Sequence, residues 1–139
     1  MNFFIFAIFC SIAASVFAQD TIQPGGKLEL WNILRSPDKR FDLGMDKSGD
    51  LVLWDNLASY KEPPAWVSGT SGSGAIRAIM QTDGQFVMQT ASGETVWSTY
   101  TRDAGSVVKL QDDGNLVVFS PNGYPVWSAK TGYGKKTTV

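Results

Sequence analysis

The sequence predicts an all-β protein built from three four-stranded antiparallel units around a pseudo-threefold axis. Three observations lead to this fold class. One segment recurs three times along the chain, turn-forming residues separate its short apolar runs, and no stretch after residue 18 keeps the 3.6-residue periodicity of an amphipathic helix. A unit of so few strands cannot bury an apolar face alone, whereas three units that face one another share a core.

The first eighteen residues are expected to be a secretory signal peptide. The segment from Asn2 to Phe17 contains no charged side chain, and it ends in Val16-Phe17-Ala18, the small-x-small pattern of a cleavage site. The alternative is a membrane anchor, but the apolar run is shorter than the roughly 20 residues of a spanning helix. We therefore expect a secreted domain over residues 19–139, without a membrane span.

Composition excludes several kinds of chemistry. The chain of 139 residues has a formal net charge of −1 and no histidine, and its one cysteine, Cys10, falls in the predicted signal peptide. Catalytic triads with histidine and metal sites with histidine or cysteine are therefore excluded. The absence of a basic stripe argues against nucleic acid. We expect no enzymatic activity, metal or cofactor, although a glycosidase with two carboxylates stays open as a further hypothesis.

The internal repeat divides the domain into copies at about residues 28–70, 75–101 and 106–131. Aligning the copies superposes three glycines and three valines: Gly49, Gly84 and Gly114, then Val52, Val87 and Val117. Asp-Gly steps at 83–84 and 113–114 predict hairpin turns or bulges, and residues 91–94 and 120–123 predict the next turns. A tryptophan ends each copy (Trp66, Trp97 and Trp127). These large rings are predicted to fill a shared core; the alternative is an exposed ring that stacks on sugar.

The third copy carries an unusual row of side chains. Strand alternation places one set on the same face: Gln111, Asp113, Asn115, Val117 and Phe119. This face offers a carboxylate, two amides and a small apolar surface. The hydroxyls of a pyranose ring both donate and accept hydrogen bonds, and its C–H edges pack on apolar groups. The row therefore predicts a carbohydrate site.

These residues resemble a known family. The pattern Gln-x-Asp-x-Asn-x-Val-x-Tyr, present up to three times per domain, is the signature of the monocot (bulb-type) mannose-binding lectins, or B-type lectins. The resemblance covers roughly residues 26–131. It implies the β-prism II fold, mannose-type glycans as partners, and a homodimer formed by exchange of a C-terminal strand, here Ser128 to Val139.

The resemblance also assigns roles in the third copy. Asp113 and Asn115 would bind the axial 2-hydroxyl of mannose, Gln111 would bind the 3-hydroxyl, and Val117 would pack on the ring carbons. Phe119 replaces the tyrosine that reaches the 4-hydroxyl. A lost hydrogen bond of this kind costs about 0.5–1.5 kcal/mol, so the site is expected to be weakened but kept.

The other two copies depart further from the signature. In the second copy Gln81, Asp83 and Val87 match, whereas Gln85 replaces the asparagine, so we expect a weaker second site or a turn that binds nothing. The first copy keeps only Val52, and its site is expected to be lost. Residues 46–50 also resemble half a calcium loop, but no glutamate follows at the twelfth position.

Two functions from different classes follow. The leading hypothesis is a secreted lectin for mannose-type glycans that acts in defence or cell recognition. The alternative is a sugar-silent β-prism scaffold that binds protein partners or assembles with itself. The departures in the first two copies and Phe119 favour this alternative.

Overall fold

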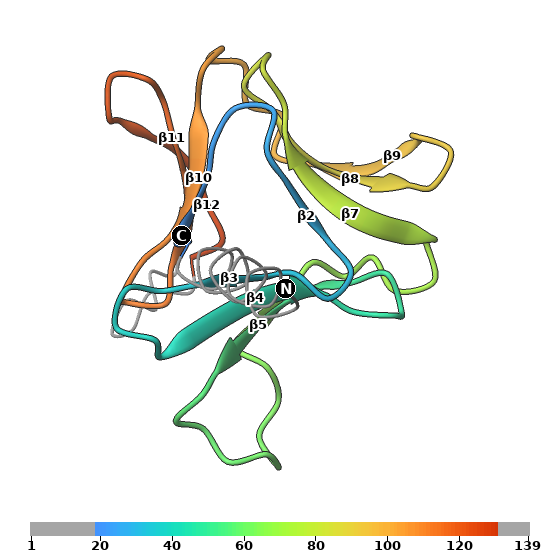
Figure 1. Cartoon of the computed structure of the whole chain (residues 1–139), viewed down its shortest axis with the longest axis vertical. Helices are drawn as coiled ribbons and strands as arrows, with labels where there is room; N and C mark the ends of the chain where they lie inside the picture. The colour runs from blue at the N-terminus through green and yellow to red at the C-terminus, as the bar shows by residue number, and fades with distance from the viewer. Residues whose placement is uncertain (1–18, 131–139) are drawn as a thin grey trace, which may run out of the picture.

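The computed structural model describes residues 19–130, so the predicted signal peptide and residues 131–139 of the predicted exchange strand lie outside it. Within this range the chain forms three antiparallel sheets of four strands each, which confirms the predicted fold class. Figure 1 shows them as the three sides of a triangle.

Each sheet is named here by the copy that supplies its central strands. Sheet I contains β3 (Ile33–Arg35), β4 (Phe41–Met45), β5 (Leu51–Asp55) and β6 (Trp66–Val67). Sheet II contains β2 (Lys27–Glu29), β7 (Ala75–Met80), β8 (Phe86–Thr90) and β9 (Thr95–Ser98). Sheet III contains β1 (Thr21–Ile22), β10 (Val107–Leu110), β11 (Leu116–Phe119) and β12 (Pro125–Ser128).

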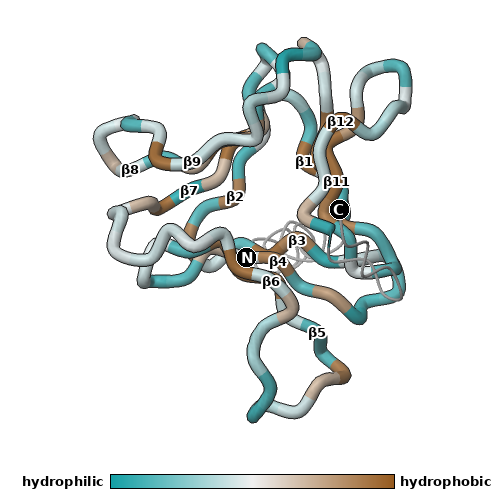
Figure 2. Tube along the Cα trace, turned by 180° about the vertical axis from the view of Figure 1, so that it is seen from behind, coloured by the Kyte–Doolittle hydropathy of each residue, from teal (hydrophilic) through white to brown (hydrophobic). Residues whose placement is uncertain are grey.

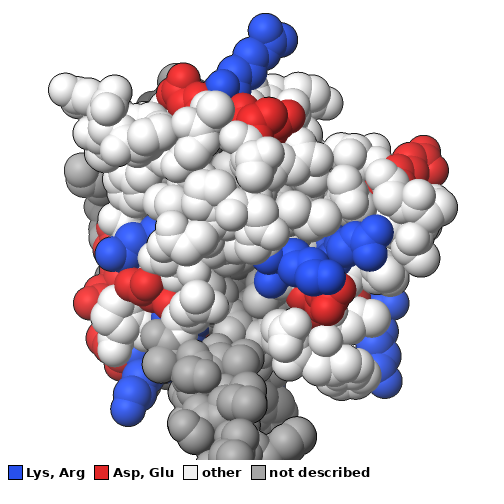
Figure 3. All heavy atoms as spheres, turned by 45° about the horizontal axis from the view of Figure 1, so that its top comes forward, with Lys and Arg blue, Asp and Glu red and all other residues white. Residues whose placement is uncertain are grey.

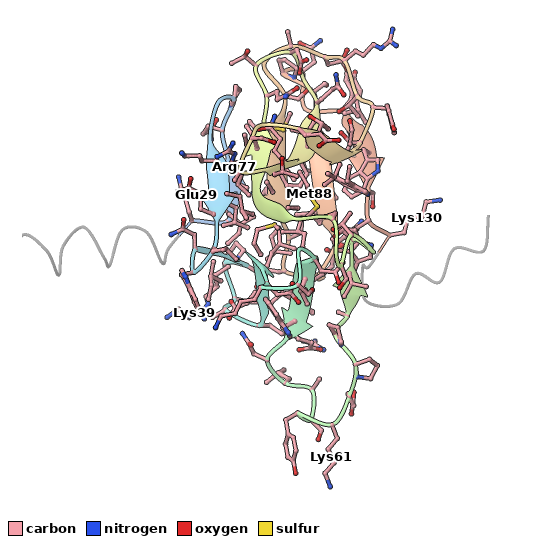
Figure 4. The ribbon with its side chains drawn as sticks, turned by 90° about the vertical axis from the view of Figure 1, so that its right-hand side faces the viewer. Glu29, Lys39, Lys61, Arg77, Met88 and Lys130 are labelled. Carbon is pink, nitrogen blue, oxygen red and sulfur yellow. The ribbon has the colours of Figure 1, made fainter. Side chains whose placement is uncertain are left out.

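The core lies between the three sheets. In β11, Leu116 and Val118 are fully buried in the core cluster, while Val117 between them lies on the outer face. Figure 2 shows apolar segments on the strands and hydrophilic segments in the connecting turns. Met88 of β8 is also fully buried, and Figure 4 shows it in the interior. Alternation therefore directs one face of the central strands toward the core and the other face outward.

The three tryptophans of the repeat meet one another, as predicted. The ring centroids lie 6.3 Å apart for Trp66 and Trp97, 6.5 Å for Trp66 and Trp127, and 5.6 Å for Trp97 and Trp127. All three pairs have edge-to-face geometry, which suits the quadrupoles of aromatic rings. The rings are partly buried against the core cluster. They therefore link the last strands of all three sheets.

Two short strands from the N-terminal segment complete two of the sheets. β1 pairs with β10, with Ile22 opposite Val108, and β2 pairs with β7, with Leu28 opposite Ala78. The second and third copies thus supply three strands each, and residues 21–29 supply the fourth strand of both sheets.

A long hairpin loop joins β5 to β6 and projects from the prism. Figure 4 shows Lys61 near its tip, and Figure 1 shows the loop standing clear of the sheets. At its base Arg40 donates to both carboxylate oxygens of Asp55, at 3.0 and 2.8 Å. These hydrogen bonds hold the pKa of Asp55 below its usual value. Residues 19–130 include no helix long and apolar enough to cross a membrane.

Candidate functional site

A tight hairpin turn begins the candidate site in the third copy. The N–H of Gln111 donates to the carbonyl of Asn115 at 3.1 Å, and the N–H of Gly114 donates to the carbonyl of Gln111 at 3.0 Å. Gly114 has a φ of 79°, which favours glycine over other residues. Asp113 lies in the turn itself, where its Oδ1 accepts the N–H of Asn115 at 2.9 Å. The turn therefore holds the Asp113 carboxylate on the backbone N–H of Asn115, directly before β11.

The outer face of β11 extends the site beyond the turn. Val117 is only 3% exposed, yet it does not belong to the core cluster. Gln111, Asn115 and Phe119 are half-buried and Asp113 is exposed. The predicted row thus combines partly exposed polar groups with the buried Val117, although Asp113 lies in the turn and not in the strand.

Ser128 is a site residue that the sequence reasoning missed. Its hydroxyl donates to Oδ1 of Asn115 at 2.8 Å, and β12 pairs it with Val117. This hydrogen bond fixes the orientation of the Asn115 amide. The available signal was the Trp-Ser pair, which occurs at 97–98 and 127–128 but is Trp66-Val67 in the first copy.

A cation lies on the other side of Val117. Lys109 of β10 pairs with Val117, and its ammonium lies 3.5 Å from the Asp20 carboxylate. On the face drawn in Figure 3, acidic and basic side chains occur in small interspersed groups. On that face the mixed charges form no continuous basic surface of the kind that attracts a polyanion.

The second copy repeats this geometry with tighter internal pairing. Asp83 Oδ1 accepts the N–H of Gln85 at 3.0 Å, and Ser98 donates to Oε1 of Gln85 at 2.7 Å. The side-chain amide of Gln85 also reaches Asp83 Oδ2 at 3.4 Å, and the Gln81 amide nitrogen, when turned to face Asp83, lies 3.2 Å from both oxygens. Val87 is buried at 1% exposure. A ligand here must compete with these internal hydrogen bonds.

The first copy uses its carboxylates for its own backbone. Asp46 Oδ1 accepts the N–H groups of Ser48 and Asp50 at 2.9 and 3.0 Å. The Ser48 hydroxyl is the main cause of the lowered pKa of Asp46. Asp50 accepts the N–H of Thr70 at 2.7 Å. Across residues 19–130 there is no group of three or more Asp, Glu, His or Cys arranged to hold a metal ion.

Solved lectins share this architecture. A lectin of Marasmius oreades superposes with a TM-score of 0.72 and 29% identity, over 81% of this chain and 92% of that chain. A monomeric monocot mannose-binding lectin of Gastrodia elata gives 0.70 and 25%, over 82% and 99%. The mannose-specific agglutinin of snowdrop (Galanthus nivalis), solved with methyl-α-D-mannoside, gives 0.64 and 27%, over 84% and 100%.

A curated relative adds a sequence match. The B-type lectin plumieribetin of Scorpaena plumieri is 46% identical over 46 residues. The match covers 33% of this chain and spans 41% of the length of that relative. No protein-family model matches the chain. In fold and in local sequence, this chain resembles the monocot mannose-binding (B-type) lectins and shares their β-prism II architecture.

Proposed function

We propose that this chain is a secreted, non-enzymatic lectin that binds mannose-type glycans through its third copy, in defence or cell recognition. The observation that carries the proposal is the third-copy site. There the turn holds the exposed carboxylate of Asp113, Ser128 orients the amide of Asn115, and Val117 lies on the outer side of β11 outside the core cluster.

This arrangement suits a hexose with neighbouring hydroxyls. Asp113 supplies an ionised acceptor, and the amides of Gln111 and Asn115 supply groups that both donate and accept. Val117 supplies an apolar floor for the C–H edge of the ring. Two mannose-binding proteins among the structural relatives support mannose as the sugar.

The second copy is proposed as a weaker site of the same kind. Its carboxylate already accepts from Gln85, and from Gln81 in the orientation that faces it, so the sugar gains less from binding there. Two sites on one chain still raise the avidity for a branched glycan, by up to about 10²–10⁴ where both engage at once. Dimerisation through residues 128–139 stays a prediction, since most of that segment is outside the described range.

Retention on mannan-agarose tests the proposal. We expect the protein to bind the resin and to elute with free mannose. Asn115→Ala should abolish retention, because it removes the amide that Ser128 orients. Gln85→Ala is the matched control, since it changes the corresponding position of the second copy, and it should be retained almost as well as the parent.

Far-UV circular dichroism of each variant shows whether the fold is kept. A folded Asn115→Ala variant that is still retained on mannan would contradict the assigned site. A parent protein that binds no glycan, while it associates with itself or with protein, would instead support the sugar-silent scaffold.

A further inference from the structure

A cleft with two tryptophans lies on sheet I, where the first copy has lost the polar signature. Its volume is about 320 Å³, close to the small end of ligand pockets. Segments around the β2–β3 turn, β4 and β5 line it: Leu30, Trp31, Asn32, Ile33, Gly44, Met45, Asp46, Lys47 and Trp54. The cleft therefore lies on the outward face of sheet I. The candidate sites of the second and third copies lie on the corresponding faces of sheets II and III.

Gly44 opens this cleft. Strand pairing sets Gly44 beside Val52, at the place that Ile79 takes beside Val87 and Lys109 takes beside Val117. A Cβ at Gly44 would lie 3.3 Å from the Asn32 carbonyl oxygen and 3.5 Å from the Trp54 ring. Only sheet I lacks a side chain at this position. A glycine inside a strand is typical of a place where another group approaches the backbone closely.

Trp54 forms one wall of the cleft. It stands five residues after Gly49, where the third copy has Phe119 and the second has Gln89. Its side chain is 38% exposed, and its ring lies over the space that Gly44 leaves. The first copy therefore carries the largest aromatic side chain of the three copies at this position.

Trp31 also lines the cleft and is held in an unusual conformation. The turn from β2 to β3 closes with the N–H of Asn32 donating to the carbonyl of Glu29 at 3.1 Å, and Trp31 has a φ of 74°. A bulky residue in this region is strained, and such strain concentrates at functional sites. The ring is 76% exposed, and the ammonium of Lys47 lies 5.0 Å from its centroid. The strained turn thus presents an indole ring to solvent.

Three polar groups complete the rim. Asp46 supplies a carboxylate acceptor through Oδ2, since its Oδ1 already accepts from Ser48 and Asp50. Lys47 supplies a donor, and the amide of Asn32 supplies both. Apolar walls with a few polar groups at the edge are the usual design of a small-molecule site.

We propose that this cleft is a separate carbohydrate site, for a hexopyranose with an uninterrupted C–H face. A gluco-configured ring carries its hydroxyls equatorially, so one face can pack on an indole ring while its edge meets Asp46, Lys47 and Asn32. The axial 2-hydroxyl of mannose interrupts one face. The cleft therefore complements the third-copy site with a different stereochemical preference, and it uses none of the same residues.

Titration of the purified full chain with methyl β-D-glucopyranoside tests the proposal. Saturation-transfer NMR and tryptophan fluorescence measure the binding. Trp31→Ala should weaken binding about tenfold, because it removes a stacking wall. Gly44→Leu should abolish binding by filling the cleft. If Gly44→Leu disturbs the folding of β4, Trp54→Leu tests the same cleft by removing its other indole ring.

Two controls separate this site from the rest of the surface. Tyr60→Ala removes an aromatic side chain that is 92% exposed outside the cleft, and Asn115→Ala removes the mannose site. Both should leave glucoside binding unchanged. A parent protein that is not retained on mannan but still binds the glucoside would count against the proposed function alone.

Three results would overturn the proposal. The first is an absence of glucoside binding, or binding that survives Trp31→Ala and Gly44→Leu. The second is equally tight binding of cyclohexanol, which would make the cleft an apolar pocket without sugar recognition. The third is self-association that Trp31→Ala abolishes, which would assign the surface to a second copy of the chain.

Discussion

At the scale of single residues, the third-copy site depends on a serine outside the sugar-binding signature. Ser128 lies on β12, beside Val117, and its hydroxyl donates a hydrogen bond to the side-chain oxygen of Asn115. Ser98 has the same relation to Gln85 in the second copy, at 2.7 Å. An amide held in one orientation loses less conformational entropy when a sugar binds. Ser128 and Ser98 therefore act as positioning residues for the amides of Asn115 and Gln85.

Replacing Ser128 by alanine is therefore expected to weaken mannose binding without unfolding the domain. The loss of one orienting hydrogen bond should cost about 0.5–1.5 kcal/mol, or roughly two- to twelvefold in the dissociation constant. Isothermal titration with a mannose oligosaccharide measures this change. Ser98→Ala is the matched control and should leave the main site within twofold, on the order of experimental error. Equal losses for both variants would contradict the assignment of the main site to the third copy.

The sequence predicted this site unevenly, for a physical reason. Alternation along β11 placed Val117 on the outer face, and the adjoining turn signal placed Asn115 directly before the strand, because both patterns are local properties of the sequence. The contribution of Ser128 depends on which strand lies next to β11, and pairing between strands is not local. Gly44 and Trp31 were missed for the same reason. Their cleft forms only when the β2–β3 turn is placed against β4 and β5.

At the scale of strands, the long central ones were predictable and the short edge strands were not. β7, β8 and β11 carry apolar runs between turn signals, whereas β1 has two residues and β2 has three. So short a segment has no periodicity to read. Its position comes from tertiary pairing, since β1 bonds to β10 and β2 bonds to β7.

These edge strands are expected to matter for stability out of proportion to their length. Ile22 of β1 is 6% exposed and belongs to the core cluster. Ile22→Ala should lower the free energy of unfolding by about 2 kcal/mol, the low end for a large-to-small core change, because an edge strand relaxes partly around the cavity. Urea unfolding followed by tryptophan fluorescence measures the change.

Thr21→Ala provides the comparison for this prediction. Thr21 is the neighbouring residue of the same strand and is only half-buried, so its replacement should change stability by no more than about 0.5 kcal/mol. If Ile22→Ala unfolds at the same urea concentration as the parent, β1 is not an integral part of sheet III.

At the scale of the whole molecule, one turn of each copy joins its sheet to the next, so that the three sheets form a ring. These signature turns contain Gly49, Gly84 and Gly114. The turn of sheet I packs on the segment before β7, where the Thr70 hydroxyl donates to the carbonyl of Gly49 at 2.7 Å. The turn of sheet II packs on the segment before β10, where Thr101 donates to the carbonyl of Gly84. The turn of sheet III packs on the segment before β4, where the N–H of Asp38 donates to Asp112. Each turn therefore shapes a candidate binding surface and also holds the next sheet.

This dual role predicts that replacing a glycine of a signature turn lowers stability more than replacing a glycine of the turn between β8 and β9. Gly84 and Gly93 both have positive φ, 96° and 87°, so Gly84→Ala and Gly93→Ala incur similar backbone strain of about 1 kcal/mol. A Cβ at Gly84 would also lie 2.6 Å from the backbone nitrogen of Asp103. A Cβ at Gly93 would have no heavy atom within 4 Å beyond those of Gly93 and its chain neighbours. Gly84→Ala should therefore destabilise the domain by roughly 3 kcal/mol in total, measured by urea unfolding. Equal destabilisation by the two variants would mean that the turn of sheet II does not bear on sheet III. A larger loss at Gly84 supports a prism in which the turns that carry the binding motif also close the ring of sheets.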